Sequence, residues 1–196
     1  MILSFHPVIK AHKNIVVAGK EGISNRVKRL IRGADAVILP QVAPFFLIET
    51  LLEYQKPHFP DQSLRIQWRN KVDQLNSFHL WGVDYPKTLV FEDLDSLFAH
   101  SALLPQRPGF PFLIKSANEH EGNNILLVED EKGLEELYGR RQELSLSSPL
   151  MVQEYIESQG YVLRVVTLYK DYVGYWKKGD SLVVNISKGA EIVEDF

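Results

Sequence analysis

Residues 110–128 read FPFLIKSANEHEGNNILLV. An apolar run at 112–114 ends on a single lysine, Lys115, and a polar segment with one glycine, Gly122, leads to a second apolar run at 125–128. Two such runs around a short polar segment predict two strands joined by a turn. A strand-terminal lysine facing the N–H groups of a turn suits an anion, because the ammonium is a compact point charge. The alternative is a lysine whose charged end only reaches solvent.

The composition is that of an ordinary globular protein. Hydrophobic residues make up 45% of the 196 residues, charged residues 24%, and the formal net charge is −3. Without a basic excess, bulk electrostatics gives no reason to expect a nucleic-acid or membrane partner. Cysteine is absent from the sequence, which excludes disulfides, thiolate zinc sites and thiol nucleophiles. No apolar run approaches the roughly 18 residues of a membrane helix, so we expect a cytoplasmic protein.

Two kinds of enzyme site are also disfavoured. The six histidines show neither H-x-x-x-H nor H-E-x-x-H spacing, and no serine lies in a G-x-S-x-G context. We therefore predict no metal-binding residues within this sequence and no hydrolase chemistry.

The first third of the sequence alternates short apolar runs with helical patterns. The runs rich in β-branched residues lie at 1–5, 14–19 and 35–40, and the helical patterns at 23–33 and 44–56. Short buried strands alternating with helices predict a parallel sheet. We therefore expect an α/β domain at residues 1–65.

The rest of the sequence predicts a mixture of helices and strands. Residues 63–82 read as one helix that ends at Gly82, and the stretch at 105–111 holds three prolines, as a linker does. Strands are expected near 83–91, 112–115, 125–128, 149–156, 161–169, 172–178 and 181–187. The predicted divisions are a connector at 66–105, one α+β lobe at 106–157 and the start of a second at 158–196.

Five motifs in this part, taken in order, resemble those of the ATP-grasp superfamily, and within it the carboxylate–amine (glutamate-ligase-like) branch. They are Asn70-Lys71 with Gly82, Pro86 and Thr88; the strand ending in Lys115; the V-Q-E-Y-I run at 152–156; the strand beginning at Arg164; and Asn185 with Gly189. The resemblance implies an α/β pre-domain followed by α+β ATP-grasp lobes, the second of which is incomplete here.

The resemblance also assigns roles to individual residues. Lys71 and Lys115 resemble the pair of lysines that contacts the ATP phosphates, although Lys71 could instead be a solvated helix lysine. The segment 119–124, which contains Glu119 and Gly122, resembles the flexible loop that covers those phosphates. The V-Q-E-Y-I run resembles the adenine hinge, or else is an ordinary amphipathic strand. Its candidate binding residues are Gln153, whose side chain could accept a hydrogen bond from the adenine amine, together with Glu154, Tyr155 and Ile156.

In the second lobe, Arg164 and Asn185 resemble residues that face the γ-phosphate or an acyl phosphate, so they are the candidate catalytic residues. Lys177 and Lys178 lie on one strand and cannot both point toward the ligand, because neighbouring strand residues face opposite ways. We take Lys178 as the ligand-binding one, with Lys188 as a further candidate.

Three features depart from the family pattern. The covering loop carries two acids, Glu119 and Glu121, which repel phosphate. Val162 stands where the family has an acid that holds the ribose. The family's magnesium ligands, an acid and an E-x-N pair, have no counterpart before residue 196. We therefore expect the Mg²⁺ ligands beyond this sequence, which would be a piece of a longer ligase and inactive by itself.

The predicted function is the ATP-binding portion of a ligase that joins an unidentified carboxylate to an unidentified amine through an acyl phosphate. A non-catalytic nucleotide-binding or regulatory module is the alternative that the missing magnesium ligands favour. A flavodoxin-like or Rossmann-like binder is a third reading of the first third of the sequence, against which the lack of a glycine-rich first turn weighs. The sequence leaves a homodimer open.

Overall fold

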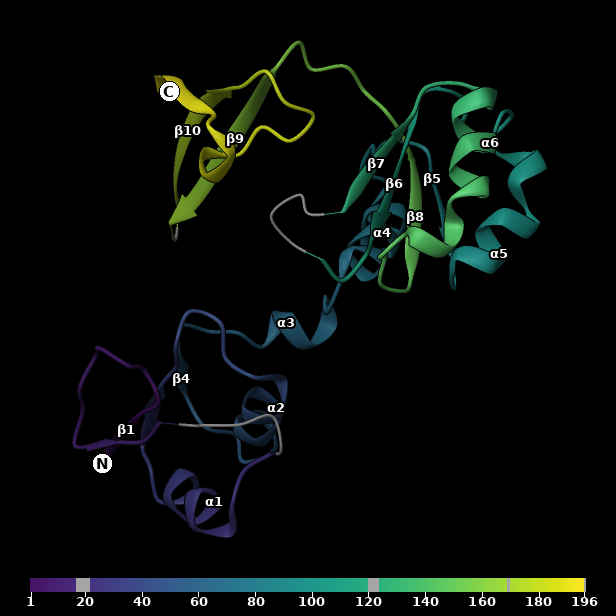
Figure 1. The fold of residues 1–196 in the computed structure, drawn as a ribbon. Helices are drawn as coiled ribbons and strands as arrows, with labels where there is room; N and C mark the ends of the chain where they lie inside the picture. Colours follow the sequence, from purple (N-terminus) through teal and green to yellow (C-terminus); the bar gives the residue numbers. More distant parts are fainter. Residues whose placement is uncertain (17–21, 120–123, 169, 196) are drawn as a thin grey trace. The chain divides into compact units, whose positions relative to one another are not determined.

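The computed structural model describes residues 1–16, 22–119, 124–168 and 170–195. The chain divides into two compact units, Met1–Arg69 and Asn70–Phe196 (Figure 1). Each unit has its own apolar core.

The first unit contains the parallel sheet that the sequence predicts. Its strands are β1 (Ile2–Ser4), β2 (Lys13–Asn14), β3 (Ala36–Ile38) and β4 (His58–Phe59), in the order β2-β1-β3-β4. All three pairings are parallel. The strand expected at 14–19 is shorter, because β2 ends at Asn14; residues 17–21 lie outside the described part of the chain. The sequence pattern missed β4, which has only two residues.

Three helices accompany this sheet. Helix α1 (Asn25–Arg32) begins at Ser24, whose side chain accepts a hydrogen bond from the Val27 N–H. Helix α2 (Phe45–Glu53) follows Pro44 and lies within the helical pattern predicted at 44–56, and α3 (Leu64–Gln67) is a single turn. The core of the unit joins sheet and helices through fully buried side chains, namely Leu3, Ile31, Leu39, Leu47, Ile48 and Leu51.

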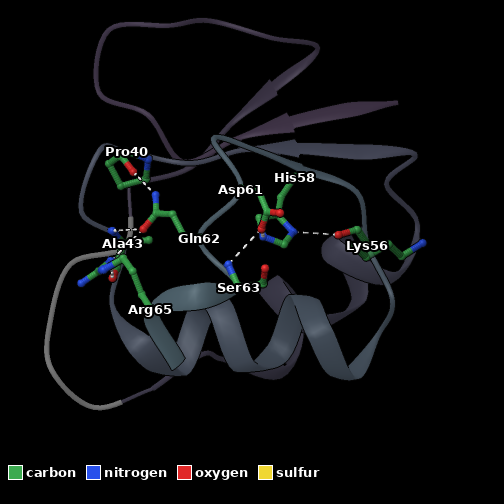
Figure 2. A network of polar contacts seen from close by, with 8 residues as sticks. All are labelled: Pro40, Ala43, Lys56, His58, Asp61, Gln62, Ser63 and Arg65. Carbon is green, nitrogen blue, oxygen red and sulfur yellow. Dashed lines mark hydrogen bonds and ion pairs between the residues drawn. The ribbon is translucent and has the colours of Figure 1, made fainter. Parts of the chain in front are cut away.

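A buried glutamine fixes the chain where it returns from β4 toward α3 (Figure 2). The side chain of Gln62 is almost fully buried, its Oε1 accepts hydrogen bonds from the Ala43 N–H and from Arg65 Nη1, and its Nε2 donates to the Pro40 carbonyl. Beside it, the Ser63 N–H donates to Asp61, and this bond holds the pKa of the Asp61 carboxyl below its usual value. This network is the physical reason why residues 61–65 take a defined course without a long helix.

The single helix predicted at 63–82 is wrong. Two helices form instead, α3 and α4 (Lys71–Trp81), with Asn70 between them. The Asn70 side chain accepts hydrogen bonds from the Val72 and Asp73 N–H groups, and Asp73 accepts one from the Asn70 N–H. Such a reciprocal cap begins a helix, and it requires Asn70 itself to be extended. The predicted end is correct, because Gly82 closes α4 in the left-handed conformation with φ of 65°.

The second unit is built around a four-stranded antiparallel sheet of β5 (Thr88–Phe91), β8 (Leu150–Glu154), β6 (Phe112–Ser116) and β7 (Ile125–Val128), in that order. One face packs on α5 (Leu94–Ala99) and α6 (Glu131–Gly139), which lie together on one side of the sheet (Figure 1). Its buried residues include Phe112, Ile114 and Val152. Two short 3₁₀ helices, Ser101–Leu103 and Arg141–Glu143, follow α5 and α6.

A three-stranded antiparallel sheet ends the chain. Its strands are β9 (Tyr161–Leu168), β10 (Asp171–Lys178) and β11 (Glu191–Asp195), with β10 in the middle. The strand predicted at 181–187 does not form. Local contacts satisfy this backbone instead, because Lys177 Nζ donates to the Val184 carbonyl and the Asn185 N–H to the Val183 carbonyl. A 3₁₀ helix at Ile186–Lys188 then leads to β11.

Candidate functional site

The free face of the four-stranded sheet carries the polar residues of the candidate site. Residues directly opposite each other on paired strands share a face. Gln153 lies opposite Thr88 on one side and opposite Leu113 on the other, and Lys115 lies opposite Met151. Because side chains alternate along a strand, all five residues face away from α5 and α6.

A small pocket of about 140 Å³ brings the two predicted phosphate lysines together. Lys71 is the first residue of α4, and its N–H donates to the Ala117 carbonyl just after β6, the strand that carries Lys115. The pocket is lined by Lys71, Gln74, Leu75, Phe78, Tyr85, Pro86, Lys115, Met151 and Gln153. Helix α4 therefore lies across the free face of the sheet, and two cations that are distant in sequence share one cavity.

The electrostatics of this pocket favour an anion. Burial lowers the pKa of Lys71, and the nearby Glu119 carboxylate offsets part of this shift. Burial and, second, repulsion from Lys71 lower the pKa of Lys115. Among the described residues that line the pocket, none carries a carboxylate. Both ammonium groups therefore lose hydration without a counter-charge in the pocket, which an anion would supply.

Lys71 also ties α4 to the start of the predicted covering loop. Its Nζ donates to the Ser116 carbonyl at 3.2 Å and to the Glu119 carbonyl. The Glu119 side chain accepts hydrogen bonds from Ser147 Oγ and Asn124 Nδ2. Glu119 is therefore held at the edge of the pocket, whereas Gly122 and its neighbours at 120–123 lie outside the described residues.

Lys115 is held by a line of three hydrogen bonds. Its Nζ donates to Gln153 Oε1 at 2.5 Å, Gln153 Nε2 donates to Thr88 Oγ1 at 2.8 Å, and Thr88 Oγ1 donates to the Pro86 carbonyl at 2.7 Å. Both ends of the Gln153 amide are thus engaged within the protein. Its predicted hydrogen bond to the adenine amine stays a prediction.

A larger pocket of about 560 Å³ adjoins the small one, since Pro86 and Gln153 line both. It is lined by Pro86, Leu113, residues 153–160, Val162, residues 179–182 and Val184. Three of the predicted hinge residues, Glu154, Tyr155 and Ile156, are therefore brought to this pocket together with Gln153. Its volume is in the range of small-molecule sites, about 300–1,000 Å³.

The backbone of the hinge is anchored on both sides. The Glu154 N–H donates to the Lys87 carbonyl, and the Tyr155 N–H donates to the Pro111 carbonyl. The Glu154 carboxylate accepts a hydrogen bond from the Lys87 N–H and lies 3.8 Å from Lys87 Nζ. Glu154 thus has a partner in Lys87, the residue directly before β5, and the hinge leaves the sheet in a fixed direction.

The remaining predicted residues divide between the two faces of the C-terminal sheet. Lys177 lies opposite Val162 on β9, so Val162, Arg164 and Lys177 share the face that borders the larger pocket. Lys178 lies on the other face, with its ammonium 5.3 Å from the centre of the Tyr161 ring. Arg164 is exposed, and Asn185 precedes the 3₁₀ helix whose Lys188 side chain lies outside the described residues. The structure therefore groups Arg164 with Lys177 and separates it from Lys178.

Sequence reasoning missed one residue of this region, Gly160. It ends the segment that lines the larger pocket, has φ of 79°, and accepts a hydrogen bond from the Gly179 N–H. A Cβ at Gly160 would lie 2.7 Å from the Gly179 carbonyl oxygen. The signal was a glycine directly before a strand, a position that often marks a close backbone approach.

Two further features are absent from the described part of the chain. It contains no group of three or more His, Cys, Asp or Glu residues that could hold a metal ion. No helix in the same residues is long and apolar enough to cross a membrane.

Comparison with known proteins shows a likeness of fold without a likeness of sequence. No family model matches the sequence, and a search of curated proteins found no similar one. A search of solved structures found N5-carboxyaminoimidazole ribonucleotide synthetase from Thermotoga maritima, at a TM-score of 0.56 and 18% identity over 91% of this chain and 46% of that one. N5-carboxyaminoimidazole synthase from Aspergillus clavatus, in complex with ADP and 5-aminoimidazole ribonucleotide, matches at 0.58 and 15%, over 92% and 48%.

A third structure is matched over most of both chains. It is a RimK domain ATP-grasp protein from Sphaerobacter thermophilus, at a TM-score of 0.52 and 14% identity over 99% of this chain and 89% of that one. The chain thus has the ATP-grasp fold, which confirms the predicted fold class, an α/β unit followed by α+β lobes. It spans about half the length of the two synthetase structures.

Proposed function

We propose that this chain binds ATP and is the nucleotide-binding portion of a ligase that joins a carboxylate to an amine. The observation that carries the proposal is the convergence of Lys71 and Lys115 in one partly buried pocket whose described lining has no carboxylate. A polyphosphate would supply the negative charge that the described lining of this pocket lacks. Two fixed cations also suit phosphoryl transfer, since they stabilise charge on the phosphate oxygens.

The adjoining larger pocket supports a nucleotide in preference to a simple phosphate. Leu113, Ile156 and Val184 give it apolar surface for a base, and residues 154–157 give it a stretch of hinge backbone. In this arrangement Glu154, Tyr155 and Ile156 line the adenine site, while Glu119 and Gly122 belong to the segment over the phosphates.

The face of the C-terminal sheet suggests which residues act on the transferred phosphate. We assign this role to Arg164 and Asn185, as the resemblance implies, and we replace Lys178 by Lys177, because Lys177 shares a face with Arg164. A planar guanidinium can hold two phosphate oxygens at once. In the proposed reaction, a carboxylate oxygen takes the γ-phosphoryl group, and an amine then displaces phosphate from the acyl carbon.

Such a reaction would use Mg²⁺ to offset the negative charge that develops on the phosphate. The described residues contain no cluster of acids that fits the ion. The same observation favours the second candidate function, a nucleotide-binding or regulatory module without catalysis.

The proposal is tested by titrating the purified chain with ADP in a calorimeter. We expect binding by the native chain, and at least a tenfold weaker affinity for Lys71→Ala and for Lys115→Ala. Lys132→Ala is the control and should bind normally, since Lys132 is a highly exposed lysine paired only at the surface with Glu136. Failure of the native chain to bind ADP, or normal affinity of both pocket variants, would contradict the proposal.

The two candidate functions are separated by a single-turnover assay of the full-length protein with any residues that lie beyond this sequence, because the nucleotide-binding portion of a ligase need not act by itself. With ATP, Mg²⁺ and mixtures of carboxylic acids and amines, a ligase releases phosphate and ADP in proportion to the amide formed. A binding module holds ATP without releasing phosphate.

A further inference from the structure

We propose that Gln153, itself held by Thr88, is a positioning residue that fixes the ammonium of Lys115 and keeps it charged. The inference rests on the proposed function in one respect, that Lys115 contacts a phosphate. It rests on geometry for the remainder. Thr88, Gln153 and Lys115 lie on three adjacent strands, β5, β8 and β6, with Gln153 in the middle strand and all three on one face.

The direction of the hydrogen bonds is fixed from both ends. The Pro86 carbonyl can only accept, so the Thr88 hydroxyl donates to it and keeps its lone pairs for the Gln153 amide NH₂. The Lys115 ammonium can only donate, so the Gln153 amide must turn its oxygen toward it. Each end alone requires the same amide orientation, and the two agree.

This line of bonds has a consequence for charge. A neutral amide accepts a hydrogen bond from the ammonium without cancelling its charge, whereas a carboxylate at the same position would form an ion pair with it. Lys115 already faces a loss of hydration and repulsion from Lys71, both of which disfavour the charged form. The hydrogen bond that the ammonium donates to Gln153 opposes these effects, because a hydrogen bond made by the charged form favours that form.

The line of hydrogen bonds through Gln153 also has a consequence for geometry. In the described part of the chain Gln153 Oε1 is the hydrogen-bond partner of Lys115, which leaves two of the three ammonium N–H groups for a ligand. An ammonium at the end of a flexible four-carbon stem has little fixed direction of its own. The amide supplies that direction and ties it to β5, where Thr88 belongs to the same motif as Lys71 and Pro86.

The first test measures the pKa of Lys115 by NMR, from the pH dependence of its ¹³Cε shift, with Lys115→Met to assign the signal. We expect Gln153→Glu to raise the pKa, and Gln153→Met and Thr88→Val to lower it. Gln142→Glu, the same change at an exposed site in the same unit, should leave it unchanged. If the pKa of Lys115 in all three pocket variants equalled its value in the native chain, the proposal would be overturned. This result does not depend on any nucleotide.

The second test measures ADP affinity in the same variants. We expect at least a tenfold loss for Gln153→Glu, whose carboxylate also repels phosphate, and a three- to tenfold loss for Thr88→Val. Thr50→Val should bind normally, because it removes the same kind of hydroxyl-to-carbonyl bond from α2 in the other unit. The loss from Gln153→Met should largely disappear when Lys115 is already Met, since Gln153 acts through Lys115.

The two tests separate the two proposals. A shift of the Lys115 pKa without ADP binding by the native chain would support the positioning role and reject the nucleotide site. ADP binding by the native chain with equal losses from Gln153→Met in the presence and absence of Lys115 would reject the positioning role and keep the nucleotide site. Circular dichroism of each variant confirms that the fold is retained.

Discussion

The N–H of Gly179 donates to the carbonyl of Gly160 at 3.0 Å, and the Gly179 carbonyl leaves no room for a side chain on Gly160. The two glycines bring the start of β9 against the end of β10, where both residues line the larger pocket. The pocket-lining segment 153–160 is thus held at its end by a backbone hydrogen bond between the two glycines. Any β-carbon at Gly160 would have to displace backbone in this pocket.

We therefore predict that Gly160→Ala destabilises the second unit by at least about 1–2 kcal/mol, the cost of a left-handed alanine, before the steric contact is added. The measurement is urea unfolding followed by tryptophan fluorescence, together with ADP affinity, which should also fall. Gly139→Ala is the matched control, since Gly139 lies in α6 with nothing within 4 Å of a Cβ and has no positive φ. Equal stability of the two variants would be evidence against a required glycine at 160.

The pair of lysines predicts a dependence on alkaline pH. Because burial lowers the pKa of Lys115 in the folded chain, the unfolded chain binds more protons between that lowered pKa and about 10.4. The free energy of unfolding should therefore rise with pH across this window, and Lys115→Met should remove the part of the rise that Lys115 contributes. The check is the difference between native and variant unfolding curves at several alkaline pH values. A larger rise in the variant would contradict the direction.

The same shift predicts proton uptake when a polyphosphate binds. The phosphate charge raises the pKa of Lys71 and Lys115 again, so protons enter the site whenever the pH is near the lowered values. Calorimetry in two alkaline buffers with different enthalpies of ionisation measures the number taken up. The number should fall in Lys115→Met; proton release by the native chain would contradict the prediction.

The cap at Asn70 links the stability of α4 to the position of Lys71. Asn70→Ala should cost about 1 kcal/mol of stability, as the loss of an N-cap does, and should weaken ADP binding because Lys71 follows directly. Ser24→Ala removes the corresponding cap from α1 in the first unit. It should cost a similar amount there and leave ADP binding unchanged. If the two variants bound ADP with equal affinity, the cap at Asn70 would have no influence on ADP binding by Lys71.

The residues of the candidate site show what could be predicted from the sequence. Lys115 was recognised because the apolar run of one strand ends at it and a second run follows, a pattern that depends only on neighbours in the chain. The break at Asn70 was missed because the apolar spacing of 63–82 fits one helix, and the competing hydrogen bonds of the Asn70 side chain leave no trace in that spacing.

Residues that depend on distant contacts could not be predicted in the same way. The engagement of Gln153 with both Thr88 and Lys115 requires the strand order β5-β8-β6, which no local pattern contains. The strand expected at 181–187 failed for a similar reason, since Lys177 takes the Val184 carbonyl that a neighbouring strand would have used. The alternation rule did state that Lys177 and Lys178 face opposite ways, but only the register with β9 shows which of them accompanies Arg164.

The register of β10 with β9 gives the last prediction. It places the adjacent Lys177 and Lys178 on opposite faces of the sheet, so that each lysine is a control for the other. Lys177 is almost fully buried and donates to the Val184 carbonyl beside the larger pocket, whereas Lys178 is exposed over the Tyr161 ring on the other face. Lys177→Met should weaken ADP binding and lower stability, since it removes a buried hydrogen bond at the pocket wall and leaves the carbonyl unpaired. Lys178→Met removes the same charge from the chain with little effect on either. Measuring both affinities at two salt concentrations excludes a general effect of net charge, which would be the same for the two variants. If Lys178→Met proved the more damaging change, the face of the sheet assigned to the nucleotide would be the wrong one, and Arg164 would have to be removed from the site with it.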